Sequence, residues 1–297
     1  MQNTLKKLFS TFLIFDELEE IPDNYQWYLT DSNQIIGIHK DELGEKDSAI
    51  LSAFLLPYDL NIPKPTKLER IWKKRITAPA PEQAEMTGQA FRFIYFHFKK
   101  DQIEPSIFKE TIKEFYSSPA AVMWESEHEG IIIEQQDSQL EEHISYEQIS
   151  DTLMSDLYVK IKFFEGPFLH DYTNLTDHYT SIIESARSAF NYTEKSAVSY
   201  VDAIPFELID EISPTKRKRI TQLILKDFMD DEDFLQTIRT FIQCNLNVSV
   251  TAKKLYMHRN SLQYRIDKFH EKTGIDVRQF EQAVTVYLAL LSNMHKG

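Results

Sequence analysis

The stretch from Asn247 to Gly274 constrains the fold of this chain more than any other part of its sequence. Asn247 and Ser249 carry side-chain oxygens that can cap the start of a first short helix. Gly274 suits the position after a second helix, where the backbone often turns left-handed. A turn is expected around Tyr256–Arg259, so the pattern predicts two short helices joined by a tight turn.

Apolar residues recur at helical spacing in both predicted helices, which indicates one buried side for the pair. The first helix contributes Ala252 and Leu255, and the second contributes Leu262, Ile266 and Phe269. A helix-turn-helix also needs a third helix to bury its apolar side. The segment 233–244 predicts that helix, because its apolar residues also fall on one face.

The other side of the second helix is polar, and its residue types suit contacts with DNA. Arginine can donate two hydrogen bonds to guanine, asparagine and glutamine can pair with adenine, and lysine contacts phosphates. The candidates for base contacts are Arg259, Asn260, Ser261, Gln263 and Tyr264. The candidates for phosphate contacts are Lys253, His258, Arg265 and Lys268. Any amphipathic helix pair has a polar side, so the charge of the segment must also be weighed.

The distribution of charge favours a surface that binds a polyanion. The whole chain has a net charge of −13, with 33 Lys and Arg against 46 Asp and Glu. Residues 247–274 nevertheless contain six Lys and Arg and only two Asp and Glu. A basic segment on an acidic protein is typical of a module that faces phosphates. A second basic run, 216–219, is expected to be a solvated face, with contact to the DNA backbone as the less favoured alternative.

The string N-V-S-x-T-A-x-x-L-x-x-H-R-N-S-L-x-Y-R-I, from Asn247 to Ile266, resembles the C-terminal helix-turn-helix of PucR/CdaR-type regulators. Residues 273–276, Thr-Gly-Ile-Asp, also match, and the spacing is similar to the Fis-type helix-turn-helix. Ser261 stands where threonine is commoner, and Tyr256 stands where many helix-turn-helix turns carry glycine.

This resemblance implies a transcriptional regulator that binds double-stranded DNA sequence-specifically and responds to a small-molecule effector. One helix-turn-helix contacts only a few base pairs, so we expect a homodimer or higher homo-oligomer. No catalytic residue, metal site or cofactor is expected. Two other functions stay open, namely a protein-interaction adaptor that has lost its DNA contacts and, less favoured, an enzyme that acts on nucleotides.

Composition restricts the environment of the chain. Cys244 is the only cysteine, which excludes an intramolecular disulfide and a zinc site built from paired cysteines. No apolar run approaches the length of a membrane span. Acidic residues follow the N-terminal apolar patch where a signal peptide needs a cleavage site. We therefore expect a cytoplasmic protein that makes no contact with a membrane.

The chain is expected to be an α/β protein of the α+β type. The segments are an N-terminal α/β module (1–60), a proline-containing linker (61–90), a degenerate GGDEF-like domain (91–200), a helical connector (201–232) and a helix-turn-helix domain (233–293). In the first segment, strands are expected at 26–30 and 34–39 around a turn at 31–33, and a helix at 45–56. A basic helix is expected at 68–76 within the linker.

The segment 91–200 has the pattern of a split βαβ arrangement. Strands are expected at 91–98, 121–125, 130–134 and 158–164, and helices at 105–116, 146–157 and 175–190. This order resembles the GGDEF-like domain of PucR/CdaR relatives. A diguanylate cyclase needs paired glycines between the two central strands, but residues 125–130 are Glu-Ser-Glu-His-Glu-Gly. The resemblance therefore concerns the fold and not the activity, and His128 is interpreted as part of a solvated turn.

Two further helical regions complete the prediction. Residues 200–225 are expected to be helical. Residues 279–291 predict a last helix with its apolar stripe at Val284, Tyr287, Leu288 and Leu291. That stripe, or the N-terminal regions, is expected to supply the interface of a dimer.

Overall fold

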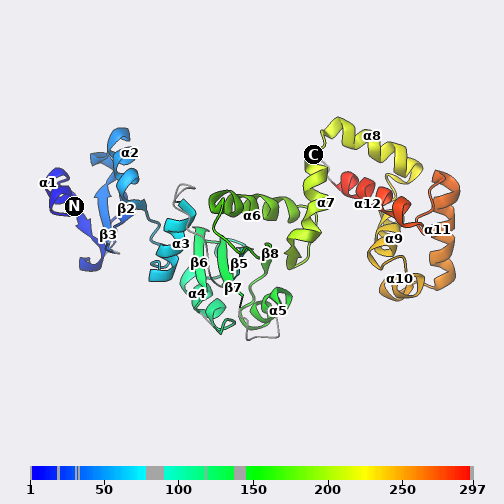
Figure 1. Ribbon diagram of the computed structural model, residues 1–297, viewed down its shortest axis with the longest axis horizontal. Helices are drawn as coiled ribbons and strands as arrows, with labels where there is room; N and C mark the ends of the chain where they lie inside the picture. Colours follow the sequence, from blue (N-terminus) through cyan, green and yellow to red (C-terminus); the bar gives the residue numbers. More distant parts are fainter. Residues whose placement is uncertain are drawn as a thin grey trace. The chain divides into compact units, whose positions relative to one another are not determined.

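The computed structural model describes residues 2–18, 21–30, 32, 34–77, 90–117, 119–136 and 145–294. The chain divides into two compact units, Met1–Ile182 and Ile183–Gly297. Helices and strands alternate in the first unit, and helices dominate the second (Figure 1). This mixture confirms the α+β class. Positions 31 and 33 of the expected turn, and Pro79 and Pro81 of the expected linker, lie outside the described residues.

The N-terminal part of the first unit is an antiparallel sheet in the order β1-β3-β2-β4. Its elements are α1 (Gln2–Leu8), β1 (Leu13–Ile14), β2 (Tyr25–Leu29), β3 (Ile35–His39), α2 (Glu45–Phe54) and β4 (Leu56–Pro57), with 3-10 turns at Phe15–Glu17 and Lys40–Glu42. The pairing of β2 with β3 confirms the two strands expected around the turn. The helix expected at 45–56 ends earlier, because Leu56 and Pro57 pair with β2 as a short strand.

The central part of the first unit contains the antiparallel strands β6, β7, β5 and β8, side by side in that order. Its elements are β5 (Phe91–Phe98), α4 (Pro105–Lys113), β6 (Ala121–Ser126), β7 (Glu129–Gln135), α5 (Tyr146–Leu157), β8 (Ile161–Glu165) and α6 (Leu175–Ala189). This order confirms the split βαβ arrangement. β8 begins later than expected, because Tyr158 adopts a left-handed conformation (φ 56°) that ends α5.

Helices cover both faces of the central sheet (Figure 1). On one face, Phe96 of β5 packs against Phe108 of α4, with ring centroids 4.7 Å apart. On the other face, Phe93 contacts Tyr179 of α6 at 5.6 Å. Phe91 packs there at 4.8 Å against Trp72 of α3 (Lys67–Thr77), which confirms the expected basic helix. α3 therefore contributes a buried side chain to the core of this unit.

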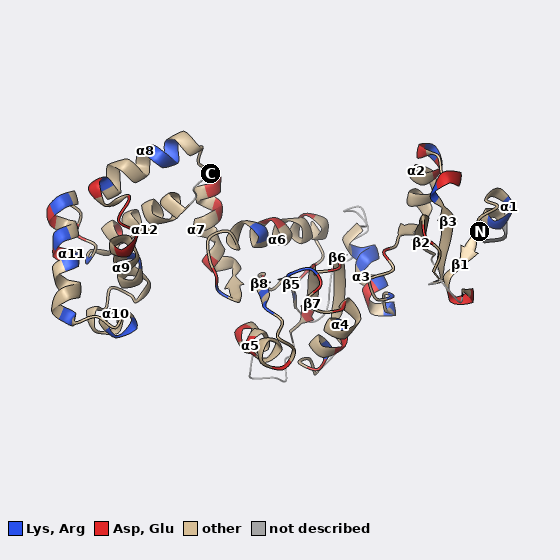
Figure 2. Ribbon diagram, turned by 180° about the vertical axis from the view of Figure 1, so that it is seen from behind, with Lys and Arg blue, Asp and Glu red and all other residues tan. Residues whose placement is uncertain are grey.

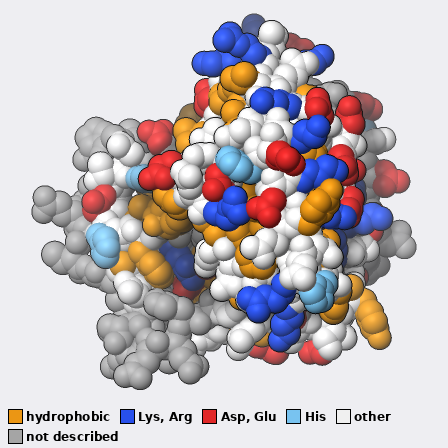
Figure 3. Space-filling model, turned by 90° about the vertical axis from the view of Figure 1, so that its right-hand side faces the viewer, with side chains coloured by type: hydrophobic (Ala, Val, Ile, Leu, Met, Phe, Trp, Pro, Cys, Tyr) orange, Lys and Arg blue, Asp and Glu red, His pale blue; other side chains and the backbone are white. Residues whose placement is uncertain are grey.

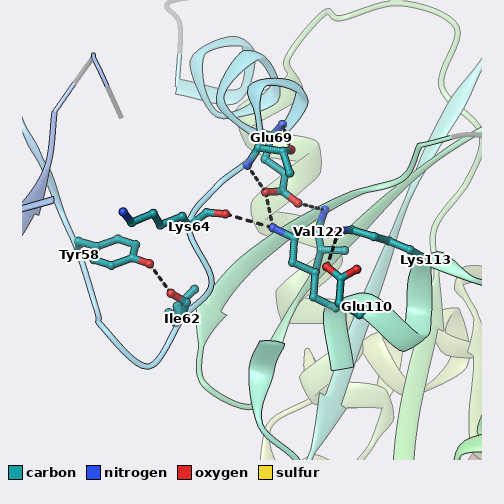
Figure 4. A network of polar contacts seen from close by, with 9 residues as sticks. Tyr58, Ile62, Lys64, Glu69, Glu110, Lys113 and Val122 are labelled. Atoms are coloured by element: carbon teal, nitrogen blue, oxygen red, sulfur yellow. Dashed lines mark hydrogen bonds and ion pairs between the residues drawn. The ribbon is translucent and has the colours of Figure 1, made fainter. Parts of the chain in front are cut away.

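A buried ion pair connects α3 to α4 (Figure 4). Glu69 Oε2 lies 2.7 Å from Lys109 Nζ, and the two side chains are only 2% and 4% exposed. Glu69 also accepts hydrogen bonds from the backbone amides of Thr66 (2.7 Å) and Val122 (3.1 Å). Lys109 Nζ donates in addition to the carbonyl of Lys64 at 3.4 Å. These hydrogen bonds offset part of the desolvation cost of burying two charges.

Replacing Glu69 by Ala is expected to lower the free energy of unfolding of the first unit by about 3–5 kcal/mol, because Lys109 becomes an uncompensated buried charge. The chain's three tryptophans, Trp27, Trp72 and Trp124, all lie in this unit. Urea unfolding followed by tryptophan fluorescence therefore measures the effect in this unit.

The matched control is Glu110→Ala, which breaks the ion pair between Glu110 and Lys113 (2.7 Å) on the same helix (Figure 4). The Glu110 side chain is 74% exposed, so this variant should lose less than about 1 kcal/mol. Equal losses in the two variants would contradict the structural importance of the buried pair.

The described part of the second unit consists of helices and one short strand. The elements are β9 (Ala197–Ser199), α7 (Tyr200–Asp210), α8 (Pro214–Leu225), a 3-10 turn at Lys226–Phe228, α9 (Glu232–Gln243), α10 (Val248–Lys254), α11 (Arg259–Thr273) and α12 (Phe280–Met294). The helices expected at 200–225, 233–244 and 279–291 are thereby confirmed. Buried residues of α9, α10, α11 and α12 share one core.

The stripe expected for the last helix is wrong in part. α12 buries Ala283, Val286, Ala289 and Leu290. Of the predicted residues, Leu291 is buried, whereas Val284 is 41% exposed and the other two are half-buried. Both sets of positions have helical spacing, so periodicity alone could not choose between adjacent stripes.

Candidate nucleic-acid interface

The side chain of Asn247 fixes the start of α10. Its Oδ1 accepts hydrogen bonds from the backbone amides of Ser249 (2.9 Å) and Val250 (3.1 Å). These amides lie in the first helical turn, where no helical carbonyl can accept from them. Asn247 is therefore the cap, while Ser249 lies inside the helix. On the inner side, Ala252 is buried as expected and Leu255 is half-buried.

The turn between α10 and α11 falls at the expected place and holds a residue in a left-handed conformation. Tyr256 has φ 51°, and its side chain is 99% exposed. The amide of Met257 donates to the carbonyl of Ala252 at 2.9 Å, which closes the turn. Residues other than glycine are disfavoured in this conformation. The turn is therefore held by its hydrogen bonds and the packing of its helices, not by the preference of Tyr256.

Both ends of α11 are capped by neighbouring residues. His258 Nδ1 accepts a hydrogen bond from the amide of Asn260 at 3.2 Å. Gly274 has φ 77° and ends the helix in the left-handed conformation expected for a glycine at that position. His258 thus has a structural role in addition to its candidacy as a phosphate contact.

The expected apolar stripe of α11 is confirmed. Leu262, Ile266 and Phe269 are at most 1% exposed. They share a core with Phe234 and Ile238 of α9. Burial of one side of α11 fixes which residues of this helix face away from the core.

All candidates for base contacts lie in the first two turns of α11 and are exposed. These are Arg259, Asn260, Ser261, Gln263 and Tyr264. The side chain of Tyr264 is 66% exposed although it is aromatic. The structure therefore places hydrogen-bonding groups and one aromatic ring together on the outer surface of this helix end.

The candidates for phosphate contacts fall into two groups. Lys253 and His258 are exposed, whereas Arg265 and Lys268 are half-buried. Arg265 Nη1 lies 2.7 Å from Asp233 Oδ2 and donates to Thr237 Oγ1 at 2.7 Å. Arg265 therefore connects α11 to α9.

Lys268 and Arg265 both lie beside α9. Lys268 Nζ lies 5.8 Å from the ring centroid of Phe234, a distance that permits a cation–π contact. Sequence reasoning missed Asp233 and Thr237 as partners of Arg265. Their spacing of four residues on α9 was visible, but their proximity to Arg265 depends on the packing of the two helices.

Acidic residues limit the basic surface to part of this unit. Asp267 of α11 lies 2.8 Å from Arg278, and Glu271 follows one turn later. In Figure 2, the red segments of α11 lie in its second half, beside blue segments. In Figure 3, basic side chains gather in separate groups with acidic side chains between them. The exposed polar residues at the start of α11, within residues 259–266, therefore form a surface that contains no carboxylate.

Replacing Tyr256 by Gly is expected to raise the free energy of unfolding by about 0.5–1 kcal/mol, because glycine tolerates positive φ. Little packing is lost, since the side chain is 99% exposed. Thermal unfolding followed by circular dichroism of the helices measures the change. The matched control is Tyr264→Gly, which places glycine inside α11 and should cost about 1 kcal/mol. The same sign of change in both variants would contradict this account of the turn.

Within the described residues, no three His, Cys, Asp or Glu side chains are grouped so that they could hold a metal ion. No helix in the same residues has the length and apolarity required to cross a membrane. His128 lies in the β6–β7 turn, where its Nδ1 is 3.3 Å from Ser126 Oγ.

Known proteins resemble this chain either over its C-terminal residues or over most of its length. The family described as the PucR C-terminal helix-turn-helix domain matches residues 234–292. The uncharacterized protein YxkF of Bacillus subtilis is 32% identical over 277 residues, which are 90% of each chain.

Two relatives with assigned functions match shorter stretches. The proline-responsive transcriptional activator PutR of Bacillus subtilis is 26% identical over 38% of this chain and 29% of its own. The carbohydrate diacid regulator of Escherichia coli is 35% identical over 21% of this chain and 16% of its own. This chain thus spans less than a third of the length of these two regulators.

Proposed function

The chain belongs to the PucR/CdaR-type family of DNA-binding transcriptional regulators, and we propose that α11 is the helix with which it reads DNA sequence. The observation that carries this proposal is the division of α11 into two sides. Leu262, Ile266 and Phe269 are buried, while the polar residues of the first two turns are exposed. An α-helix fits the major groove of DNA, where side chains near its N-terminus reach the base edges.

Each candidate residue has a specific proposed contact. Arg259 has the geometry to contact guanine, and Asn260 and Gln263 have the geometry to contact adenine. Ser261 and Tyr264 supply hydroxyl groups next to them. For the backbone, Lys253, His258 and Lys268 are the proposed phosphate contacts. Arg265 would contact a phosphate from the position in which its ion pair with Asp233 holds it.

The protein is also proposed to respond to a small-molecule or metabolic signal in the cytoplasm, without a cofactor. The support is by analogy, since PutR is a proline-responsive activator. Two alternatives predict other outcomes. An adaptor would show no DNA affinity. An enzyme acting on nucleotides is opposed by the β6–β7 turn, which carries Glu127 and His128 in place of paired glycines.

Three substitutions in α11 separate base contacts from phosphate contacts. Arg259→Ala and Gln263→Ala are each expected to weaken binding to the recognised site by about 1–3 kcal/mol and to change binding to scrambled DNA little. Lys268→Ala should weaken binding to both DNAs and lower the salt slope by roughly one. Titrations of specific and scrambled duplexes at several salt concentrations, followed by fluorescence anisotropy, measure these effects.

The matched control is Lys218→Ala, since Lys218 is an exposed lysine of the same unit on α8. Circular dichroism checks that every variant is folded. If the three α11 variants bind both DNAs like the wild type, α11 is not the recognition helix.

We further propose that the protein acts as a homodimer. Two-fold symmetry supplies two half-sites one DNA turn apart, which one helix-turn-helix cannot do. α7 offers a stripe of exposed apolar residues for the interface. Val201 is 62% exposed, Ile204 47% and Leu208 59%. Such a stripe on a soluble unit favours contact with another copy of the chain over contact with water.

Replacing Ile204 and Leu208 together by Lys is expected to convert the dimer into a monomer, because the two lysines of each copy would be buried against those of the other copy. Sedimentation velocity measures the change. Met154→Lys is the matched control, since Met154 is 50% exposed on α5 of the first unit. A wild-type protein that is monomeric both free and on DNA would contradict the proposed dimer, and a double variant that remains dimeric would contradict the interface on α7.

A further inference from the structure

A cavity of about 420 Å³ lies inside the second unit, away from the exposed surface of α11. Its walls come from residues 191–195, α7, α9 and α12. Val198, Phe206 and Leu291 form an apolar part, and each is at most 6% exposed. Most of the rest of the lining is polar and opens to solvent, and a volume of roughly 300–1,000 Å³ is the usual size of a small-molecule site.

Arg239 of α9 lines this cavity, and the hydrogen-bond donors of its charged guanidinium are not all paired. Its Nη1 donates to Gln236 Oε1 at 3.3 Å. Its Nε is buried and has no hydrogen-bond partner among the described residues. Burial lowers the pKa of Arg239, because desolvation disfavours the charged guanidinium. A buried donor without a partner is costly, which leaves Arg239 an incompletely satisfied charge in the wall of the cavity.

Other polar groups around the cavity limit the chemistry of the ligand. Tyr287 also lines it, and burial raises the pKa of its hydroxyl, which therefore stays protonated and can donate. Glu194 and Asp202 place carboxylates at the exposed edge, and Asp202 Oδ2 lies 3.9 Å from Lys195 Nζ. A ligand of suitable size would thus meet donors at Arg239 and acceptors at the edge.

We propose that this cavity binds a small organic carboxylate that also carries an ammonium or hydroxyl group. The carboxylate would accept hydrogen bonds from the guanidinium of Arg239, whose planar donors match a carboxylate. The ammonium or hydroxyl group would donate to Glu194 or Asp202. The carbon skeleton would contact Phe206, Val198 and Leu291.

Binding there would affect the helix-turn-helix through α9. One side of α9 carries Arg239, and the other packs on α11 through Phe234 and Ile238. The ion pair of Asp233 with Arg265 joins the same two helices. A ligand that contacts α7, α9 and α12 together would therefore favour one position of α9, and hence of α11. This regulatory consequence rests on the proposed function, whereas binding at the cavity does not.

The test uses the full-length protein and a panel of probes, namely the common L-α-amino acids, L-lactate and L-malate. Isothermal titration calorimetry in the absence of DNA measures binding. We expect at least one probe to bind, and its carboxamide to bind much more weakly. Arg239→Gln should weaken that binding by about 10- to 100-fold, the range of a charge-assisted hydrogen bond. Lys218→Gln on α8 should leave it unchanged.

A second variant covers the case in which Arg239→Gln does not fold. Gln243→Glu changes an exposed residue that lines the cavity and should also weaken binding, by repulsion of the carboxylate. Three outcomes would overturn the proposal: no probe binds, the carboxamide binds equally well, or both variants keep wild-type affinity. DNA titrations with and without the best probe form a separate arm. Absence of DNA binding without any probe would contradict the proposed role of α11 and leave the cavity proposal unaffected. A DNA affinity that the best probe does not change would contradict the regulatory consequence.

Discussion

The packing of α11 on α9 is the contact on which the proposed DNA-binding surface depends. Leu262, Ile266 and Phe269 can be buried together only when α11 has one rotation about its axis. That rotation directs the polar residues of its first two turns outward. The ion pair between Arg265 and Asp233 adds a directional contact at the edge of the same interface. The exposure of the proposed DNA contacts thus depends on side chains that pack inside the protein.

Local signals in the sequence predicted much of this arrangement. Asn247 and Gly274 mark helix ends through their own side-chain and backbone preferences, and the structure uses both as expected. The strands of the central sheet were also recognisable, since Phe91–Phe98 is a run of aromatic and β-branched residues. In each case the physical cause lies within a few residues of its effect, so the sequence displays it directly.

Contacts between distant residues could not be predicted in the same way. Glu69 is a single acid in a basic helix, and its burial against Lys109 depends on how α3 packs against the sheet. The ion pair of Arg265 with Asp233 joins residues that no local pattern connects. In α12, two adjacent stripes had equally good spacing, and the neighbouring helices decided which one was buried. The cavity beside Arg239 likewise exists only because several helices and a loop meet there.

The carboxylates of Asp267 and Glu271 on α11 have a consequence for the way this helix can approach a duplex. Phosphates line both edges of a DNA groove, and like charges repel at short range. A helix lying flat along the groove would bring both carboxylates close to that lining. Arg278 neutralises Asp267 in part, while Glu271 forms no ion pair within the described residues. In the proposed binding mode these two carboxylates favour a helix that enters the groove by its tip, and Lys268 between them keeps the one phosphate contact proposed for this half of α11.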